Sequence, residues 1–472
     1  MGEKCCKNQK TKCESEPDSI RESTKSTFIP DHETQEPIFP PELKKVKIEE
    51  LTIKGPRATW YRPTTLDRLM AIRCANPTSK IITGNTECGV ETKFRGLLYP
   101  HLISPVAVSE LNAIQILPDR LHIGASSTLT EIDRKLRGWI KAEKCAKTQV
   151  AESMCEILTW FAGDQIRNVS AIGGNLMTAS PISDLAPILM ASGASVQFGD
   201  SPAEIKSAEI DETFFTGYRK TVIPNSSTLL SISIPHSPEN SFFRAYKQSK
   251  RKEDDIAIVN GAFFVEFEPN STKVKHFRAS YGGMAPTTKM ATKTNSRAIG
   301  LEWDDNLLRL LTDSFSAEFD LPPNCPGGFV AYRKCLVTSL FFKFFITVQA
   351  ELAAKKLVKP SSKDDSAIGE IVRPKIESLQ SAHVDTSDAV GQSMKVISAG
   401  KQVSGQAVYV DDIPPMANEA YFGPVLSNNA NAKILSIDWT AADELEGVIG
   451  HVDYNDVPGN GFKIDSVWLV VG

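Results

Sequence analysis

Two glycine-containing stretches constrain this chain most, IITGNTECG at Ile81–Gly89 and IGGNLMTASPISD at Ile172–Asp184. Glycine admits positive φ and lets the backbone approach a ligand closely, and successive exposed N–H groups in such a turn form a concave anion site. Almost no Lys or Arg stands in either stretch. The pattern therefore indicates a diphosphate held by backbone amides, although neither stretch fits a standard phosphate motif. Taken alone, each stretch is better explained by an ordinary β-turn.

Length, charge and cysteine usage exclude several protein classes. The 472 residues suffice for about two to four domains. With 53 basic and 57 acidic residues and a net charge of −4, the chain offers no global attraction for nucleic acid or an anionic membrane. Nine irregularly spaced cysteines favour reduced thiols over a disulfide framework. Because the polar start does not resemble a signal peptide, we expect a cytoplasmic protein.

Polar stretches predict where the chain is not globular. Residues 1–55 are rich in Lys, Glu, Ser, Thr and Pro, which predicts a mobile arm, with 34–43 (TQEPIFPPEL) suited to docking as a strap. Cys5, Cys6 and Cys13 are interpreted as loop thiols, because no cluster of further metal ligands follows them. The polar residues 359–395 predict a linker. The apolar run 336–350 is interrupted by Lys343, so a buried helix is favoured over a membrane span.

Hydrophobic periodicity predicts alternating helices and strands. The expected helices are 64–76, 129–142, 149–162 (with Gly163 as a glycine C-cap), 305–318 and 326–356. The expected strands are 80–83, 101–106, 113–117, 120–123, 195–198, 228–234, 242–248, 256–268 and 275–281, with further short strands in 404–472. Between two of these strands lies 249–255 (SKRKEDD), which packs three positive and three negative charges into seven residues. On charge alone this run is interpreted as a solvated connection.

Taken together in order, further segments carry a resemblance to a known family. They are 81–94 (IITGNTECGVETKF), 160–194 (WFAGDQIRNVSAIGGNLMTASPISDLAPILMASGA), 214–221 (FFTGYRKT), 245–259 (AYKQSKRKEDDIAIV), 281–285 (YGGMA), 326–345 (PGGFVAYRKCLVTSLFFKFF) and 404–414 (SGQAVYVDDIP). Over nearly its whole length the chain resembles the xanthine dehydrogenase family of molybdenum hydroxylases, in its flavin portion.

The resemblance implies an α+β fold. The implied domains are an N-terminal arm and interdomain strap (1–55), a two-lobed PCMH-type FAD-binding domain (56–235), a small α+β domain (240–356), a linker (357–395) and the truncated start of an α/β molybdopterin domain (396–472). FAD would lie extended between the two lobes of the second of these domains.

The resemblance also implies a set of cofactor-binding residues. The first stretch would cradle the diphosphate and adenosine of FAD through Ile81, Ile82, Thr83, Gly84, Asn85, Thr86, Glu87 and Cys88, with Glu87 turned away from the phosphates. The diphosphate and ribityl chain would also be held by Ala171, Gly174, Asn175, Thr178 and Asp184. Phe161 and Leu229 would contact the isoalloxazine, with Lys247 nearby. Without the resemblance, Phe161 and Leu229 would be interpreted as core residues. Because relatives carry serine in place of Ala171, any contact there must come from its backbone.

A second implied set gates the electron acceptor. Tyr218, Arg251, Asp254 and Asp255 match the pattern of residues that admit NAD beside the flavin. A negative charge near the ring opposes the gain of negative charge on it, so this loop would favour hydride transfer to NAD over loss of electrons to oxygen.

The expected partners follow from what the chain does not carry. The 2Fe-2S clusters of the family need eight cysteine ligands ahead of the strap, and the molybdopterin site would need residues beyond Gly472. We therefore expect a truncated central portion, by natural loss or an incomplete gene model, that works with iron–sulfur and molybdenum domains and does not hydroxylate purines or aldehydes alone. A homodimer is left open. The leading function is an FAD module that passes electrons to NAD; the alternatives are an aldehyde-oxidase-like module using oxygen and a non-catalytic FAD-binding protein.

Overall fold

The computed structural model describes residues 43, 45–143, 145–251, 254–359, 395–427, 429, 432–453 and 456. They fall into two units, the described residues from 43 to 359 in one and those from 395 to 456 in the other. The predicted strap and the cysteines at 5, 6 and 13 lie outside the described residues, as does nearly all of the predicted linker.

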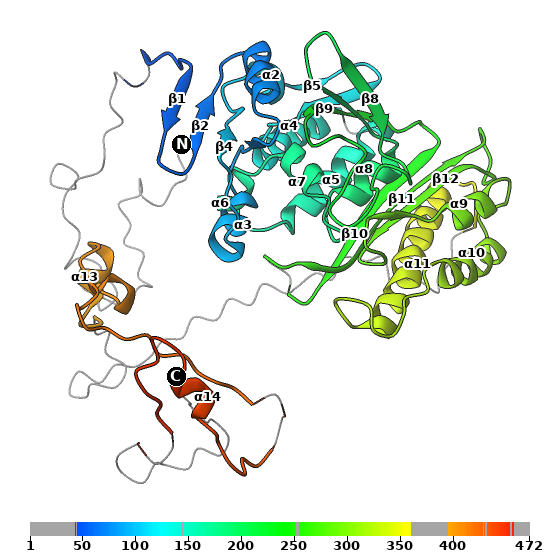
Figure 1. Ribbon diagram of the computed structural model, residues 1–472. Helices are drawn as coiled ribbons and strands as arrows, with labels where there is room; N and C mark the ends of the chain where they lie inside the picture. Colours follow the sequence, from blue (N-terminus) through cyan, green and yellow to red (C-terminus); the bar gives the residue numbers. More distant parts are fainter. Residues whose placement is uncertain are drawn as a thin grey trace, which may run out of the picture. The chain divides into compact units, whose positions relative to one another are not determined.

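A small lobe opens the first unit. Its elements are β1 (Leu51–Lys54), β2 (Thr59–Arg62), α2 (Leu66–Ala75), β3 (Lys80–Ile81), α3 (Cys88–Arg95) and β4 (His101–Ile103), with the sheet order β1-β2-β4-β3 (Figure 1). The helix α2 begins where expected, because the Thr65 side chain accepts a hydrogen bond from the Arg68 amide at 3.3 Å. The prediction of a mobile arm through residue 55 is wrong for β1. Leu51 pairs with Arg62 in an antiparallel ladder, which supplies hydrogen bonds that composition does not reveal.

A larger lobe follows, built on a five-stranded sheet in the order β5-β6-β9-β7-β8. Its strands are β5 (Ile114–Ile116), β6 (Arg120–Gly124), β7 (Ser195–Gly199), β8 (Ile205–Glu209) and β9 (Thr228–Pro235). Its helices are α4 (Leu129–Ala142), α5 (Gln149–Thr159), α6 (Asp164–Arg167), α7 (Ile172–Thr178) and α8 (Ala186–Ser192). The predicted helix 129–142 is confirmed with its bounds, because Thr128 and Glu131 form a capping box at its start.

The strand β9 joins the two lobes. Its successive side chains point to opposite faces, so Leu229 enters the core of the larger lobe and Leu230 the core of the small lobe.

After the two lobes, the first unit continues with an antiparallel sheet in the order β10-β11-β12-β13. Its strands are β10 (Ser241–Ser249), β11 (Ala257–Phe267), β12 (Val274–Gly282) and β13 (Lys289–Met290). One face packs on α5 and α8; the other is covered by α9 (Thr292–Ala298), α10 (Asp305–Glu318) and α11 (Val330–Ala354) (Figure 1). Successive side chains of β11 point to opposite faces of this sheet. Phe264 therefore enters the core of the larger lobe, and Phe263 enters the core between the sheet and the helices α9, α10 and α11. Phe263 stacks on Phe344 of α11 with ring centroids 5.2 Å apart. By length and composition α11 could cross a membrane, but 44% of its most apolar window is buried in protein, and the expected core helix is confirmed.

Three predictions about local structure are wrong. The helix α5 ends at Thr159, and Gly163 is not its cap: Ala162 adopts the left-handed conformation (φ 43°) and Gly163 instead begins α6. Residues 172–178 of the second glycine stretch form α7, so that its glycines lie in a helix rather than in a loop. In the described part of 404–456 no strand forms; the elements of that unit include α13 (Ala399–Val403) and α14 (Thr440–Asp443). Its large apolar side chains, among them Val408, Tyr421 and Leu435, are exposed and pack into no core formed by the described residues.

Candidate functional site

The first glycine stretch leaves a run of backbone amides without acceptors. Its strand β3 ends at Ile81, and the Ile82 amide still donates to the Ile103 carbonyl at 2.8 Å. From Thr83 to Cys88, no amide donates a backbone hydrogen bond to any described residue. We call residues 83–88 the amide run. Folded proteins pair nearly all buried amides, so consecutive free donors beside the start of α3 form a site suited to an anion.

The glycines of this stretch do not act through positive φ. Within the amide run only Asn85 is left-handed, with φ 59°. Gly84 is required for packing instead, because a Cβ there would overlap the backbone carbonyl of Val169. This contact brings the amide run against the chain that leads into α7, so the two stretches lie side by side.

In the second stretch, the first amides of α7 already donate hydrogen bonds, and the helix offers open space beside Gly174. The Ile172 amide donates to the Ser127 carbonyl at 3.2 Å, and the Gly173 amide to the Ala125 carbonyl at 2.9 Å. At Gly174 the residue is exposed and a Cβ would meet nothing within 4 Å. Asn175 is oriented by the Ser183 hydroxyl, which donates to its Oδ1 at 2.7 Å, while Thr178 at the end of α7 is half-buried. The open face of α7 thus borders the amide run without blocking it.

A buried ion pair closes the second stretch. Lys247 Nζ lies 2.6 Å from Asp184 Oδ2, and the two side chains are only 4% and 8% exposed. Lys247 also donates to the Trp160 carbonyl at 2.9 Å, and Asn260 Nδ2 donates to Asp184 Oδ1 at 3.1 Å. Burial raises the pKa of Asp184, although Lys247 and Asn260 both act to lower it. Lys247 therefore fixes the end of β10 to the segment before α6.

A second ion pair lies on the amide run itself. Glu87 Oε1 accepts a hydrogen bond from Arg219 Nη2, and these side chains are 38% and 24% exposed. Partial burial lowers the pKa of Arg219, but the hydrogen bond and charge of Glu87 raise it overall. Next to it, Glu91 of α3 accepts from the Tyr99 hydroxyl at 2.6 Å and lies 3.4 Å from Lys80 Nζ.

The predicted ring contacts lie on the larger lobe. Phe161 is half-buried and packs against its core, and Leu229 is buried within that core. Ala171 is buried directly before α7 and makes an isolated bridge with Thr128. Their core packing agrees with the alternative interpretation of Phe161 and Leu229, and leaves the ring contact a prediction.

The residues predicted to gate the electron acceptor differ in whether their side chains are bonded. Asp255 is engaged: its carboxylate accepts from the Arg251 amide at 2.8 Å and from the Ile256 amide at 2.9 Å. Arg251 lies 3.5 Å from that carboxylate. Asp254 has a left-handed backbone (φ 49°), and only its carbonyl, not its carboxylate, is bonded to Arg251. Tyr218 is 61% exposed on a separate turn. Residues 252 and 253 lie outside the described residues.

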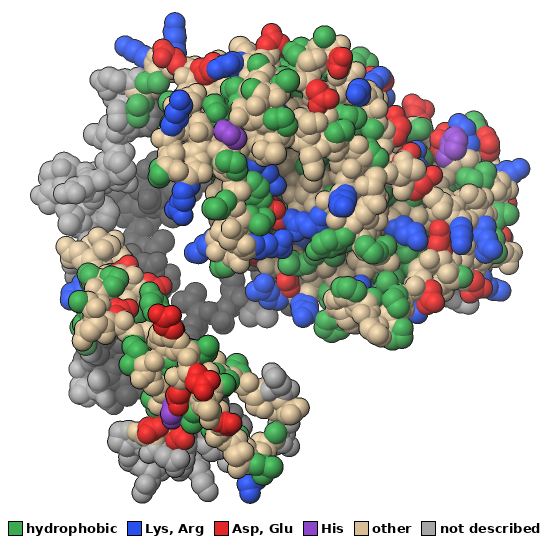
Figure 2. All heavy atoms as spheres, viewed as in Figure 1, with side chains coloured by type: hydrophobic (Ala, Val, Ile, Leu, Met, Phe, Trp, Pro, Cys, Tyr) green, Lys and Arg blue, Asp and Glu red, His purple; other side chains and the backbone are tan. Residues whose placement is uncertain are grey.

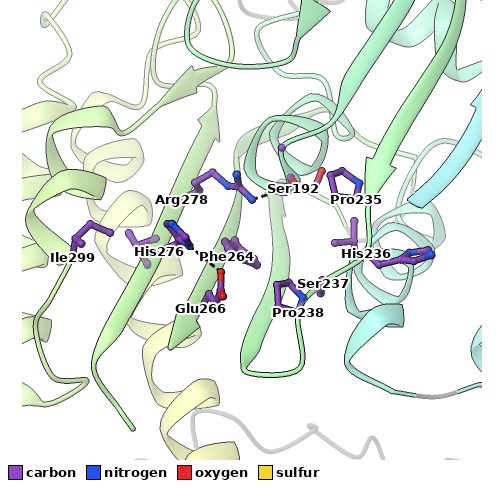
Figure 3. A pocket seen from close by; sticks show the side chains of 13 residues that line it. Ser192, Pro235, His236, Ser237, Pro238, Phe264, Glu266, His276, Arg278 and Ile299 are labelled. Carbon is purple, nitrogen blue, oxygen red and sulfur yellow. Dashed lines mark hydrogen bonds and ion pairs between the residues drawn. The ribbon is translucent and has the colours of Figure 1, made fainter. Parts of the chain in front are cut away.

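Basic side chains gather near this site. Figure 2 shows Lys and Arg side chains around a recess on the face between α3 and the end of β10. A separate cavity of about 380 Å³ lies elsewhere, between the turn after β9 and strands β11 and β12 (Figure 3). It is lined by Ser192, His236, Glu266, Arg278 and others, but by none of the predicted cofactor residues.

Three residues that hold the site together were not predicted. Arg219 entered the sequence analysis only as part of 214–221 (FFTGYRKT). Asn260 is a buried polar residue in the middle of the mostly apolar β11. Arg73, buried on α2, donates to the Ser79 carbonyl at 2.6 Å and to the Ser226 carbonyl at 3.0 Å. It thereby ties the residue before β3 to the loop before β9. A polar residue within an apolar run of β11 was the signal for Asn260. Arg73 on α2 gave no signal, because its acceptors are backbone carbonyls and the one at Ser226 lies 153 residues away in the sequence.

Comparisons with known proteins agree with this architecture. Residues 53–237 match the family model of the FAD binding domain in molybdopterin dehydrogenase, 244–348 the CO dehydrogenase flavoprotein C-terminal domain, and 404–469 the a/b hammerhead domain of aldehyde oxidase and xanthine dehydrogenase. The fold is similar to quinoline 2-oxidoreductase from Pseudomonas putida 86 (TM-score 0.54, 19% identity, covering 62% of this chain and 98% of that chain). It is also similar to carbon monoxide dehydrogenase from Hydrogenophaga pseudoflava (TM-score 0.53, 19% identity, covering 61% of this chain and 95% of that chain).

Full-length relatives extend well past this chain. It is 41% identical over 458 residues to the xanthine dehydrogenase/oxidase of Gallus gallus, covering 92% of this chain and 33% of the relative. It is 40% identical over 488 residues to the xanthine dehydrogenase of Calliphora vicina, covering 99% of this chain and 36% of the relative. The chain thus spans about one third of the length of these curated relatives. On its successive family models and these identities, the chain belongs to the xanthine dehydrogenase family of molybdenum hydroxylases and contains the FAD-binding domain of that family.

Proposed function

We propose that this chain binds FAD between its two lobes and serves as the flavin module of a larger oxidoreductase. One observation carries the proposal: the amide run, residues 83–88, has no backbone acceptors among the described residues and lies against the entry to α7. Backbone amides can hold a diphosphate without salt bridges. The residues present fit the cofactor, because Gly174 leaves open space on the neighbouring helix.

The chain's own residues bind and orient in this proposal. Residues 81–88 hold the diphosphate and adenosine, and Ala171, Gly174, Asn175 and Thr178 border the diphosphate and ribityl chain. Phe161 and Leu229 supply an apolar surface for the ring and exclude water from it. Lys247, held by Asp184, places a positive charge at the end of β10. The flavin, when bound, would supply the redox chemistry that links an iron–sulfur partner to NAD.

Choice of the acceptor is proposed to depend on Asp254 and Arg251, with Tyr218 beside the entrance for NAD. The Asp254 carboxylate forms no hydrogen bond or ion pair with any described residue, whereas the Asp255 carboxylate accepts hydrogen bonds from two amides. Asp254 is therefore the member of the charged run whose charge acts on the recess without an intervening ion pair. We further propose that this module works with the 2Fe-2S and molybdenum domains of a full-length enzyme. Its proposed location is the cytoplasm, and its proposed assembly is a homodimer.

The experiment starts from the purified chain. A flavin absorption spectrum with about one FAD per chain supports the proposal; no retained or titratable flavin contradicts it. NADH-driven reduction of an artificial acceptor then distinguishes a working module from a mere FAD binder, and rapid reoxidation by oxygen in place of NAD would indicate the oxidase alternative.

A charge variant tests the acceptor residues. Asp254→Asn should slow NADH-dependent reduction and speed the reaction with oxygen, changing the rate ratio about tenfold. Asp305→Asn, at the exposed start of α10, is the control with the same substitution outside the charged run. Equal stopped-flow traces for both variants and the parent would identify the run as a solvated loop.

A further inference from the structure

Glu87 presents an electrostatic problem for the proposed diphosphate site. It lies within the amide run, so its carboxylate belongs to the same short loop as the free donors. Two like charges in a partly buried site repel one another strongly. A loop selected to hold a diphosphate would be expected to avoid a carboxylate, unless the negative charge is neutralised from elsewhere.

Arg219 supplies that neutralisation. Its guanidinium donates to Glu87 Oε1 from a position 132 residues further along the chain. No other described cation forms an ion pair with Glu87; the neighbouring Lys80 is paired with Glu91. The pair is mostly shielded, with 24% of the Arg219 side chain and 38% of the Glu87 side chain exposed, so solvent screens it less than a surface pair.

The turn that carries Arg219 is held in one conformation. The Thr216 amide donates to the Lys220 carbonyl at 3.1 Å, and the Lys220 amide donates to the Gly217 carbonyl at 3.0 Å. Arg219 itself adopts a left-handed backbone with φ 55°. Such a conformation costs energy for a residue other than glycine and persists only where surrounding contacts enforce it. The turn is thus built to direct this side chain, and it also carries the exposed Tyr218.

We propose that Arg219 is a positioning residue for cofactor binding, which acts through Glu87 by cancelling a charge that would otherwise repel the diphosphate. The proposal rests on the proposed FAD site. The proposal also has a consequence for Tyr218 on the same turn. FAD bound at the amide run stabilises the pair of Glu87 and Arg219, and this pair holds Tyr218 in place at the entrance for NAD.

A double-mutant cycle tests this proposal, with the FAD dissociation constant measured by flavin fluorescence titration. Arg219→Gln should weaken FAD binding about tenfold, because Glu87 is left unpaired beside the diphosphate. Glu87→Gln should instead tighten binding, because Arg219 is then free to attract it. The double variant Glu87→Gln/Arg219→Gln should recover most of the loss, which a merely structural pair would not do.

Salt and a matched control complete the test. The loss in Arg219→Gln should shrink at high ionic strength, as expected for repulsion between charges. Lys220→Gln removes the same charge from the same turn, at an exposed residue without an ion pair among the described residues, and should change affinity less than twofold. The proposal is overturned if Arg219→Gln and Lys220→Gln bind FAD equally well, or if the double variant is as weak as Arg219→Gln. Failure of the parent to bind FAD would contradict the proposed function itself.

Discussion

The two glycine stretches look alike in sequence but differ in what they contribute. Each contains glycine followed by asparagine, and each contains a carboxylate paired with a cation. The first keeps its amides free and uses Gly84 to pack against Val169, with a partly exposed ion pair. In the second, the first amides donate to backbone carbonyls, Gly174 leaves open space, and the ion pair is buried. The same residue type thus serves packing in one stretch and access in the other.

This difference follows from secondary structure. In the first stretch the chain leaves a short strand and turns before α3, so its donors have no regular acceptors. In the second the chain is already helical at Ile172, and neighbouring carbonyls at 125 and 127 satisfy the first turn. The variants below separate the two roles.

The largest effect is expected from the buried pair of the second stretch. Lys247→Met leaves the Asp184 carboxylate buried without its cation and should lower the free energy of unfolding by about 3–5 kcal/mol at pH 7. Burial already raises the pKa of Asp184 in the folded state, so its ionisation opposes folding. The loss should therefore be smallest below about pH 3, where the carboxyl is protonated in both states, and grow as the pH rises through the raised pKa. Denaturant unfolding at several pH values measures this.

Lys250→Met is the control for that variant. Lys250 is exposed and lies over the Phe329 ring at 5.1 Å, so its loss should cost less than about 1 kcal/mol. Equal destabilisation by the two variants, or a loss in Lys247→Met that does not depend on pH, would contradict the role of the pair.

The second effect concerns packing in the first stretch. Gly84→Ala places a Cβ against the Val169 carbonyl and should lower the free energy of unfolding of the apo-protein by about 2–3 kcal/mol. Gly174→Ala introduces the same methyl group into open space on α7 and should leave stability unchanged or raise it by up to about 1 kcal/mol. Thermal unfolding without flavin compares them; equal stability of both variants would remove the distinction between the two glycines.

The third effect concerns access at the second stretch. Gly174→Val should raise the FAD dissociation constant by about tenfold or more, equivalent to about 1.4 kcal/mol, because the side chain enters space proposed for the cofactor. Apo stability should change by less than about 0.5 kcal/mol, since nothing lies within 4 Å of the new Cβ. Full flavin content in Gly174→Val would remove α7 from the cofactor site.

The smallest effect separates ring contact from core packing. Phe161→Ala should weaken FAD binding by about 0.5–1.5 kcal/mol more than it destabilises the apo-protein, because an aromatic contact contributes beyond its buried area. Flavin titration and apo unfolding are measured on the same variant. Equal losses would assign Phe161 to the core of the larger lobe alone.

Several elements could be predicted from sequence because their signals are local. The helix at 129–142 carries its capping box and apolar spacing within a few residues, and the bounds of α10 were equally readable from periodicity. The family also followed from the sequence, because many segments in order are specific where one glycine stretch is not. The strand β1 was missed, since a four-residue edge strand depends on its partner β2 for every hydrogen bond.

What the sequence determined by itself is the family, the order of most helices and strands, and which residues are candidates for the cofactor. Tertiary structure alone decided which of these candidates act and how. Four interactions join residues far apart in the chain: the contact of Gly84 with Val169, the pairs of Glu87 with Arg219 and of Lys247 with Asp184, and the hydrogen bond from Arg73 to the Ser226 carbonyl. Their physical cause is packing and neutralisation of charge between separate elements, which local propensity and spacing do not encode.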